Sequence, residues 1–270
     1  VIAFYVTPLH AQKSQGVNLA EMQDWNIVIA DDAIASEVYA AEEFQEFFHQ
    51  ASGLKLPIVH KITRWDKHVF IGPGKVMHAS PAGFSVEDLG PEDLRVVVRD
   101  DNIAIAGGRP RGTLYGVYTF LEDYLGVRFL THEHTHVPAV GDKRPIGPLD
   151  RVYRPPFDNL RLNGYKACYR FPVFGVRTRN NGYHDQPRFG GMSPFGNIGH
   201  SFYRQVPYEK YGKDHPKYFN LWNGKRMNYF MATHLCLTNP DLLPIVTDAV
   251  LNLIESPAAV GRKNFAVSQN

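Results

Sequence analysis

The sequence has little cysteine, little net charge and no long apolar segment after its first residues. Its two cysteines, Cys168 and Cys236, are far apart and show no CxxC spacing, which excludes the common zinc and dithiol motifs. We expect two buried thiols, although a disulfide between them is compatible with the sequence. The formal net charge of +2 gives no reason to expect nucleic acid or an anionic membrane as a partner. Since no later segment is apolar over about 18 residues, we expect no membrane-spanning helix.

The chain is long and rich in aromatic side chains. Its 270 residues are enough for a substantial core in one or two domains. Hydrophobic residues make up 44% and charged residues 21%, as in folded globular proteins. The 14 Tyr and 17 Phe suit a protein that stacks on sugar rings, but they suit a large core equally well.

Residues 1–11, VIAFYVTPLHA, resemble the end of a signal peptide, because an apolar run is followed by small and polar residues. On this interpretation cleavage follows Ala11, and the protein is exported to the periplasm, the cell surface or the medium. An N-terminal strand is the alternative.

Residues 26–137 predict an α+β domain, a sheet with helices on one face, in the order β-α-β-β-β-α-β. The expected strands are 26–30, 68–72, 94–99, 102–106 and 127–130, and the expected helices are 37–50 and 113–124. The proline-rich stretch 138–156 is expected to be a linker.

Residues 157–270 predict the first half of a (β/α)8 barrel, which places functional side chains at the carboxyl ends of its strands. The expected strands are 157–163, 198–202, 235–237 and 265–268, and the expected helices include 171–180 and 240–254. Four strands cannot close a barrel, and an open last strand is a liability. We therefore expect the chain to be a truncated fragment.

Two motifs suggest ion binding, but neither is specific. GGRPRG at 107–112 precedes a helix and could hold a phosphate, yet it is neither GxGxxG nor a P-loop, which favours a tight turn. The alternating histidines of HEHTH at 132–136 could hold zinc if the segment were a strand. Its position after a strand and before Pro138 favours a simple edge, so we predict no metal and no cofactor.

Several residues could contact carbohydrate. His200 in GNIGHSF and Asn163 each lie at the end of an expected barrel strand, and Trp222 belongs to an aromatic loop that could line a sugar subsite or simply pack. Glycoside hydrolysis needs a carboxylic acid and a second stabilising group. The carboxylates of this region form no obvious pair, so the catalytic acid is expected after Asn270.

The run AGGRPRGTLYGVYTFLEDYLGVRFLT resembles the N-terminal domain that precedes the barrel in glycoside hydrolase families 20 and 67. Four later runs are GHSFYRQVPYEKYGKDHPKYFNL, NGKR, LCLTNPDLLPIV and FAVSQN. Together they are similar to glycoside hydrolase family 163, formerly a domain of unknown function. The resemblance covers residues 27–270.

This resemblance implies an endo-β-N-acetylglucosaminidase that acts on N-glycans of glycoproteins and is exported by glycan-degrading bacteria. The implied mechanism is retaining and substrate-assisted: the 2-acetamido group attacks the anomeric carbon, one carboxyl acts as acid and another orients the amide. By the same resemblance His200, Gln269 and Asn270 contribute to the substrate pocket. The catalytic carboxyls then follow Asn270, and the chain alone is expected to be inactive. HEHTH departs from the family pattern.

Two alternatives stay open. One is a non-catalytic carbohydrate-binding protein. The other is a related hydrolase such as an α-glucuronidase-like enzyme, in which Arg161, Arg177 and Arg179 could bind a uronic carboxylate.

Overall fold

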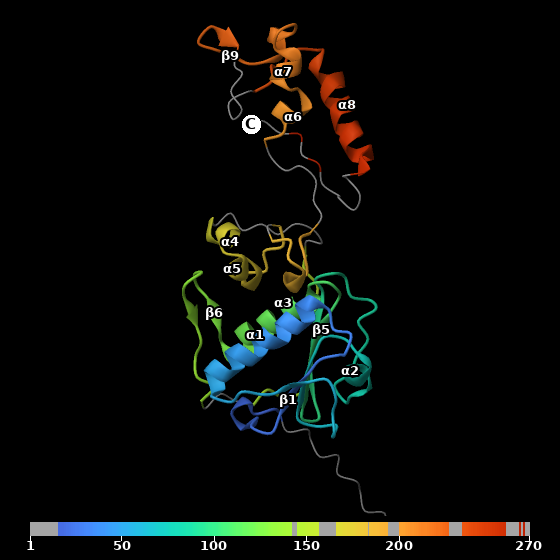
Figure 1. Cartoon of the computed structure of the whole chain (residues 1–270), viewed down its shortest axis with the longest axis vertical. Helices are drawn as coiled ribbons and strands as arrows, with labels where there is room; N and C mark the ends of the chain where they lie inside the picture. Colours follow the sequence, from blue (N-terminus) through green and yellow to red (C-terminus); the bar gives the residue numbers. More distant parts are fainter. Residues whose placement is uncertain are drawn as a thin grey trace, which may run out of the picture. The chain divides into compact units, whose positions relative to one another are not determined.

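The computed structural model describes residues 16–141, 145–156, 166–182, 184–193, 200–226, 234–257, 265 and 267 (Figure 1). The chain divides into two compact units, Val1–Met192 and Ser193–Asn270. No helix in the described ranges is long and apolar enough to cross a lipid bilayer.

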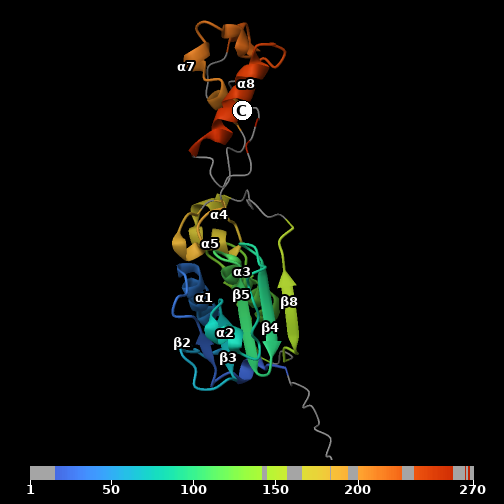
Figure 2. The same ribbon diagram turned by 90° about the vertical axis from the view of Figure 1, so that its right-hand side faces the viewer.

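A six-stranded mixed sheet forms the centre of the first unit, with the strand order β2-β1-β3-β5-β4-β8. The strands are β1 (Asn26–Val28), β2 (Ile58–Val59), β3 (His68–Ile71), β4 (Leu94–Arg99), β5 (Asn102–Gly107) and β8 (Leu149–Tyr153). The strands β2, β1, β3 and β5 are parallel, whereas β4 runs antiparallel to both β5 and β8. Figure 2 shows β5, β4 and β8 side by side.

Neighbouring side chains of a strand point to opposite faces of the sheet, and in β1, β3 and β5 nearly all of them are buried, so both faces are covered there. Ile27, Val69 and Ile105 belong to the larger core cluster. The helices α1 (Ala35–Ser52) and α3 (Gly112–Phe120) pack on this face, and α3 continues into a π-helical turn, η2 (Leu121–Leu125).

The opposite face has its own core of Val28, Phe70 and Ala104. Met77 of the short helix α2 (Lys75–Ala79) and Phe84 of the following loop cover it. The expectation of helices on one face only is therefore wrong. The mixed α/β organisation and the expected order of the main elements from β1 to α3 are confirmed.

Three smaller elements differ from expectation. The strand β6 (Arg128–Phe129) pairs with β7 (Thr135–His136) in a separate two-stranded sheet instead of joining the main one.

Residues 149–153, expected within a linker, form β8 and pair with β4. Its side chains are largely exposed, so it lacks the apolar signal of a buried strand; Asp150 instead accepts hydrogen bonds from Arg95 at 2.8 and 2.9 Å. A 3-10 turn, η1 (Leu19–Glu21), precedes β1.

Residues 166–192 also belong to the first unit, although the sequence placed them in a barrel. They form α4 (Lys166–Arg170), α5 (Pro172–Arg177) and η3 (Pro187–Phe189). Cys168, Phe174 and Phe189 are buried in the core cluster that contains α1. The Arg179 Nη2 donates to Glu122 Oε2 at 2.6 Å, which adds a polar contact to η2.

The second unit has a small core formed by Phe202, Val206, Tyr218, Phe219, Leu235 and Leu242. Its elements are α6 (Phe202–Gln205), α7 (Tyr208–Tyr211), η4 (Pro216–Tyr218), β9 (Leu221–Trp222), β10 (Lys225–Arg226) and α8 (Leu242–Glu255). The expected helix 240–254 is confirmed by α8.

The expected parallel strands of a half-barrel are not found among the described residues of this unit. Phe202 begins a helix, Leu235 forms only an isolated bridge with Phe219, and β9 and β10 are antiparallel. The expected strand 157–163 and half of 265–268 lie outside the described residues.

Candidate functional site

Of the six residues expected to contact substrate, His200 and Trp222 lie in the described part of the chain. Arg161, Asn163, Gln269 and Asn270 lie outside it. His200 is exposed and has a positive φ of 40° directly before α6. It therefore lies shortly before a helix, and residues 198 and 199 of the expected strand lie outside the described residues.

The fold of α6 explains why His200 remains exposed. Phe202 is buried in the core, and the carbonyl of the buried Ser201 accepts hydrogen bonds from the N–H groups of Arg204 and Gln205. These contacts fix the backbone immediately after His200, so its imidazole is held at the surface of this unit.

Trp222 is held on a tight hairpin. Asn223 and Gly224 connect β9 to β10 with φ values of 48° and 76°, as a two-residue hairpin with an Asn-Gly turn requires. The Arg226 Nη1 donates to the Phe219 carbonyl at 2.7 Å and ties the hairpin to the core. The Trp222 side chain is 65% exposed, so an aromatic surface is available for an apolar sugar face.

The remaining aromatic residues of this loop divide between core and surface. Tyr218 and Phe219 are buried, and the Tyr218 ring stacks on His215 with a centroid distance of 4.7 Å. Loop packing thus accounts for these two rings, and Trp222 is the stronger candidate for ligand contact. The Asn223-Gly224 pair was the sequence signal for this hairpin, and the sequence analysis did not use it.

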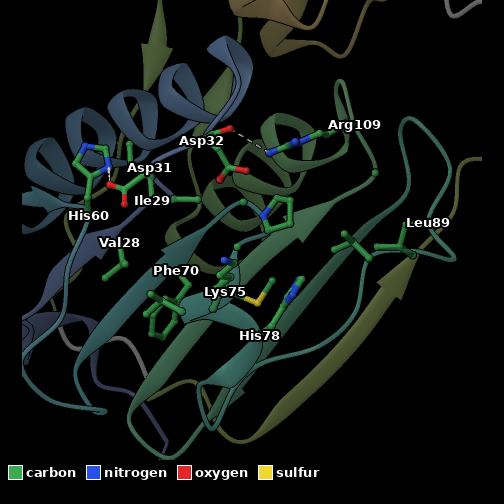
Figure 3. Close-up of a pocket in the computed structure, with 18 residues that line it drawn as sticks. Val28, Ile29, Asp31, Asp32, His60, Phe70, Lys75, His78, Leu89 and Arg109 are labelled. Carbon is green, nitrogen blue, oxygen red and sulfur yellow. Dashed lines mark hydrogen bonds and ion pairs between the residues drawn. The ribbon is translucent and has the colours of Figure 1, made fainter.

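A second candidate site, which the sequence analysis missed, is a cavity of about 720 Å³ in the first unit (Figure 3). It lies at the carboxyl ends of β1 and β3, beside the loop that follows β5. Its polar lining consists of Asp31, Asp32, His60, Lys75, His78 and Arg109, and its larger apolar side chains are Val28, Ile29, Phe70, Met77, Val86 and Leu89.

Arg109 is fixed on one side of this cavity by the buried Glu37 of α1. Its Nε donates to Glu37 Oε1 at 2.9 Å and its Nη2 donates to Oε2 at 3.0 Å. The hydrogen bond to Glu37 is the main reason why the pKa of Arg109 is raised. Glu37 Oε2 also accepts the Ile34 N–H at the start of α1, so one carboxylate orients both the helix and the arginine.

The GGRPRG motif forms the turn before α3, and HEHTH lies in the turn and strand of the β6–β7 pair. In GGRPRG the turn leads into α3, and Arg111 is directed to Glu92 and to the Gly190 carbonyl, at 2.8 and 3.0 Å. In HEHTH, His132 stacks on Phe171 with a centroid distance of 3.7 Å. No group of three or more metal-ligating side chains occurs among the residues that the structure describes.

The two cysteines lie in different units, and both are free thiols. Cys168 is buried, as expected, whereas Cys236 is partly exposed, so the expectation of two buried thiols holds only for the first.

Comparison with known proteins identifies one family model and several solved structures. Residues 159–270 match the family described as Domain of unknown function (DUF4838). No curated protein matches.

Three of the similar structures are glycoside hydrolases. A family GH20 β-N-acetylhexosaminidase from Streptomyces coelicolor is 10% identical, with a TM-score of 0.38 over 64% of this chain and 31% of its own. A mutant β-hexosaminidase from Streptomyces plicatus is 13% identical, with the same TM-score and shares. A family GH115 4-O-methyl-α-glucuronidase is 13% identical, with a TM-score of 0.43 over 84% of this chain and 34% of its own.

The chain thus spans about a third of the length of these three structures. TM-scores of this size establish neither a shared fold nor a shared activity. The family match covers the stretch in which the sequence resemblance to family 163 was most specific. Residues 159–270 are therefore the part of the chain that is similar to DUF4838.

Proposed function

We propose that the chain is part of a glycoside hydrolase, an endo-β-N-acetylglucosaminidase that acts on the N-glycans of glycoproteins. The observation that carries the proposal is that the motifs resembling family 163 and the match to the family model fall in the same part of the chain. All four motifs that resemble family 163 fall within the residues 159–270 matched by the family model. Trp222, which lies inside this stretch, offers the exposed ring that sugar binding uses.

The proposed mechanism is retaining and assisted by the 2-acetamido group of the substrate, with one carboxyl as acid and a second that orients the amide. The proposal places these carboxyls after Asn270, as the resemblance implies. It assigns substrate binding to His200 and Trp222, together with Arg161, Asn163, Gln269 and Asn270. Export from the cell is part of the same proposal.

The test is to express the product of the whole gene and incubate it with a protein that carries N-glycans. Mass spectrometry should find released glycan, with a single N-acetylglucosamine left on the asparagine. The 270-residue chain alone is expected to release none and serves as the matched control. Intact glycoprotein after incubation with the whole product, or glycan released together with both core N-acetylglucosamine residues, would contradict the proposal.

A non-catalytic carbohydrate-binding protein is the second candidate, and the exposed Trp222 favours it because stacking needs no carboxyl pair. Binding of N-glycan without release would support it. The α-glucuronidase-like alternative is weakened, because two of the three arginines proposed to bind a uronic carboxylate already have partners. Arg177 pairs with Glu43 and Arg179 pairs with Glu122 within the first unit.

A further inference from the structure

The cavity in the first unit lies at the carboxyl ends of β1 and β3, two neighbouring strands whose following helices pack on opposite faces of the sheet. β1 leads into α1 on one face, whereas β3 leads into α2 on the opposite face. The loops that leave these two neighbouring parallel strands therefore lead to opposite faces of the sheet, and the cavity is lined by residues at the carboxyl ends of the strands. Open α/β sheets bind their ligands at such a switch point.

Two glycines in the lining, Gly72 and Gly74, allow the loop after β3 to pack closely against its neighbours. Gly72 has a φ of 84°, and a Cβ there would lie 3.2 Å from Glu37 Cγ. A Cβ on Gly74 would lie 2.8 Å from the Cβ of Ala30. The loop after β3 is therefore packed directly against the start of α1 and the loop after β1. With Glu37 also holding Arg109, the walls are set by packing before any ligand arrives.

The lining combines an apolar floor with separated charges. Val76, Val86 and Leu89 line the cavity and are partly exposed, so they present apolar surface to it. Asp31 and Asp32 lie toward one side, where Asp31 is 3.6 Å from His60, and Lys75 lies between Asp32 and His78 (Figure 3). In the part of the chain that the structure describes, none of the ion pairs uses Lys75. Lys75 is exposed at this site, and the ion pairs that other lining residues make, Asp31 with His60 and Arg109 with Glu37, do not involve it.

We propose that this cavity binds a monosaccharide that carries one anionic group, a carboxylate or a phosphate. The hydrogens on one sugar face pack on the partly exposed Val76 and Val86, and hydroxyl groups donate to Asp31 and Asp32. The anionic group pairs with Lys75. The volume of about 720 Å³ is within the range of small-molecule sites, which are typically about 300–1,000 Å³.

Other ligands fit this chemistry less well. A neutral sugar makes no charge-assisted contact with Lys75. A bare anion makes no contact with the apolar side chains and no hydrogen bond to either aspartate. A purely apolar ligand would bury the two carboxylates without hydrogen bonds, which costs free energy.

The experiment is calorimetric titration of the 270-residue chain with four probes: a hexuronic acid, a hexose phosphate, N-acetylglucosamine and inorganic phosphate. At least one of the two anionic sugars should bind more tightly than both of the other probes. Preference for the uronic acid identifies a carboxylate ligand, and preference for the hexose phosphate identifies a phosphorylated one.

Lys75→Met should weaken binding of the preferred sugar about tenfold or more, because it removes a charge-assisted contact. Lys55→Met, which removes an exposed lysine outside the cavity, is the matched control and should bind as the unmodified chain does. Equal affinities of the two variants, inorganic phosphate as tight as the sugars, or no binding of either anionic sugar would each overturn the proposal. Because the readout is binding in the first unit, its failure is distinct from failure to release glycans.

Discussion

The Arg177 guanidinium binds both carboxylate oxygens of Glu43, with Nε to Oε2 and Nη2 to Oε1 distances of 2.8 Å each. The pair joins α5 to α1 across 134 residues of sequence. Glu43 also accepts a hydrogen bond from the Tyr118 hydroxyl at 3.1 Å. Burial and the Glu43 carboxylate raise the pKa of Tyr39 to about 12, so this tyrosine stays neutral beside the pair at physiological pH.

Arg177→Met should destabilise the first unit by about 2–3 kcal/mol, because a buried carboxylate that loses its partner is costly. Urea unfolding followed by circular dichroism measures the change. Arg177→Lys keeps the charge but not the two-point geometry. Its free energy of unfolding should therefore lie between those of Arg177→Met and the unmodified chain.

Arg151→Met is the matched control. Its ion pair with Asp123 has side chains that are 52% and 41% exposed, and exposed pairs contribute about 0–1 kcal/mol. Similar losses in the Arg177 and Arg151 variants would show that the Glu43 pair is not a structural anchor.

A second prediction compares two glycines that both have positive φ. Gly53 ends α1 at a φ of 76° with open space around its Cα, whereas Gly72 at 84° faces the Glu37 side chain. Gly53→Ala should cost about 1 kcal/mol from backbone strain alone. Gly72→Ala should cost more, about 2 kcal/mol, because Glu37 must also shift. The difference in the free energy of unfolding isolates the packing at the cavity wall, and equal losses would mean that Glu37 moves freely.

The sequence predicted those parts of the fold that carry local signals. The alternating and continuous apolar runs identified β3, β4 and β5, and the apolar periodicity with Gly53 at its end identified α1. By contrast, β8 is an exposed strand whose pairing depends on Arg95, far away in sequence. Nothing local marks such a strand.

The candidate sites were less predictable, because their residues also come together only through contacts between distant parts of the sequence. The cavity collects residues from five separate stretches of the sequence between Val28 and Arg109, and neither Asp31 nor Lys75 stands in a recognisable motif. The pairing of Arg177 with Glu43 is likewise a long-range contact, so the arginine looked available for a ligand when only the sequence was considered. Trp222 was named as an aromatic candidate from the sequence, but its separation from the buried Tyr218 required the structure.

A third prediction concerns Trp222 and depends on the proposed function. Trp222→Ala should weaken binding of an N-glycan oligosaccharide to the whole gene product about tenfold, because a stacking surface is lost. The midpoint of thermal unfolding should not change, since the ring is exposed. Trp65→Ala removes another tryptophan, 53% exposed but in the first unit, and should leave affinity unaltered. If both variants bind as tightly as the unmodified protein, Trp222 is not part of the substrate site.

The last prediction is a pH dependence of stability that arises from His68 in β3. Its side chain is fully buried, and its Nε2 lies 3.0 Å from the Arg64 carbonyl. Burial lowers the pKa of the imidazole below its ordinary value of 6.5. Below pH 6.5 the unfolded chain therefore takes up a proton that the folded chain resists, and the free energy of unfolding falls until the pH reaches the lowered folded pKa. The contribution of one such group is at most about 1.4 kcal/mol per pH unit.

Urea unfolding at pH 7.5 and 5.5, together with an NMR titration of the imidazole, measures this effect. His68→Gln keeps a donor for the Arg64 carbonyl but cannot titrate, so this variant should lose less stability between the two pH values than the unmodified chain. His134→Gln removes an exposed histidine of the turn between β6 and β7 and should leave the pH dependence unchanged. Other groups titrate equally in all three chains, so their effect cancels in the comparison. An identical pH dependence in the His68 variant and the unmodified chain would show that the buried imidazole accepts its proton as readily as in the unfolded state.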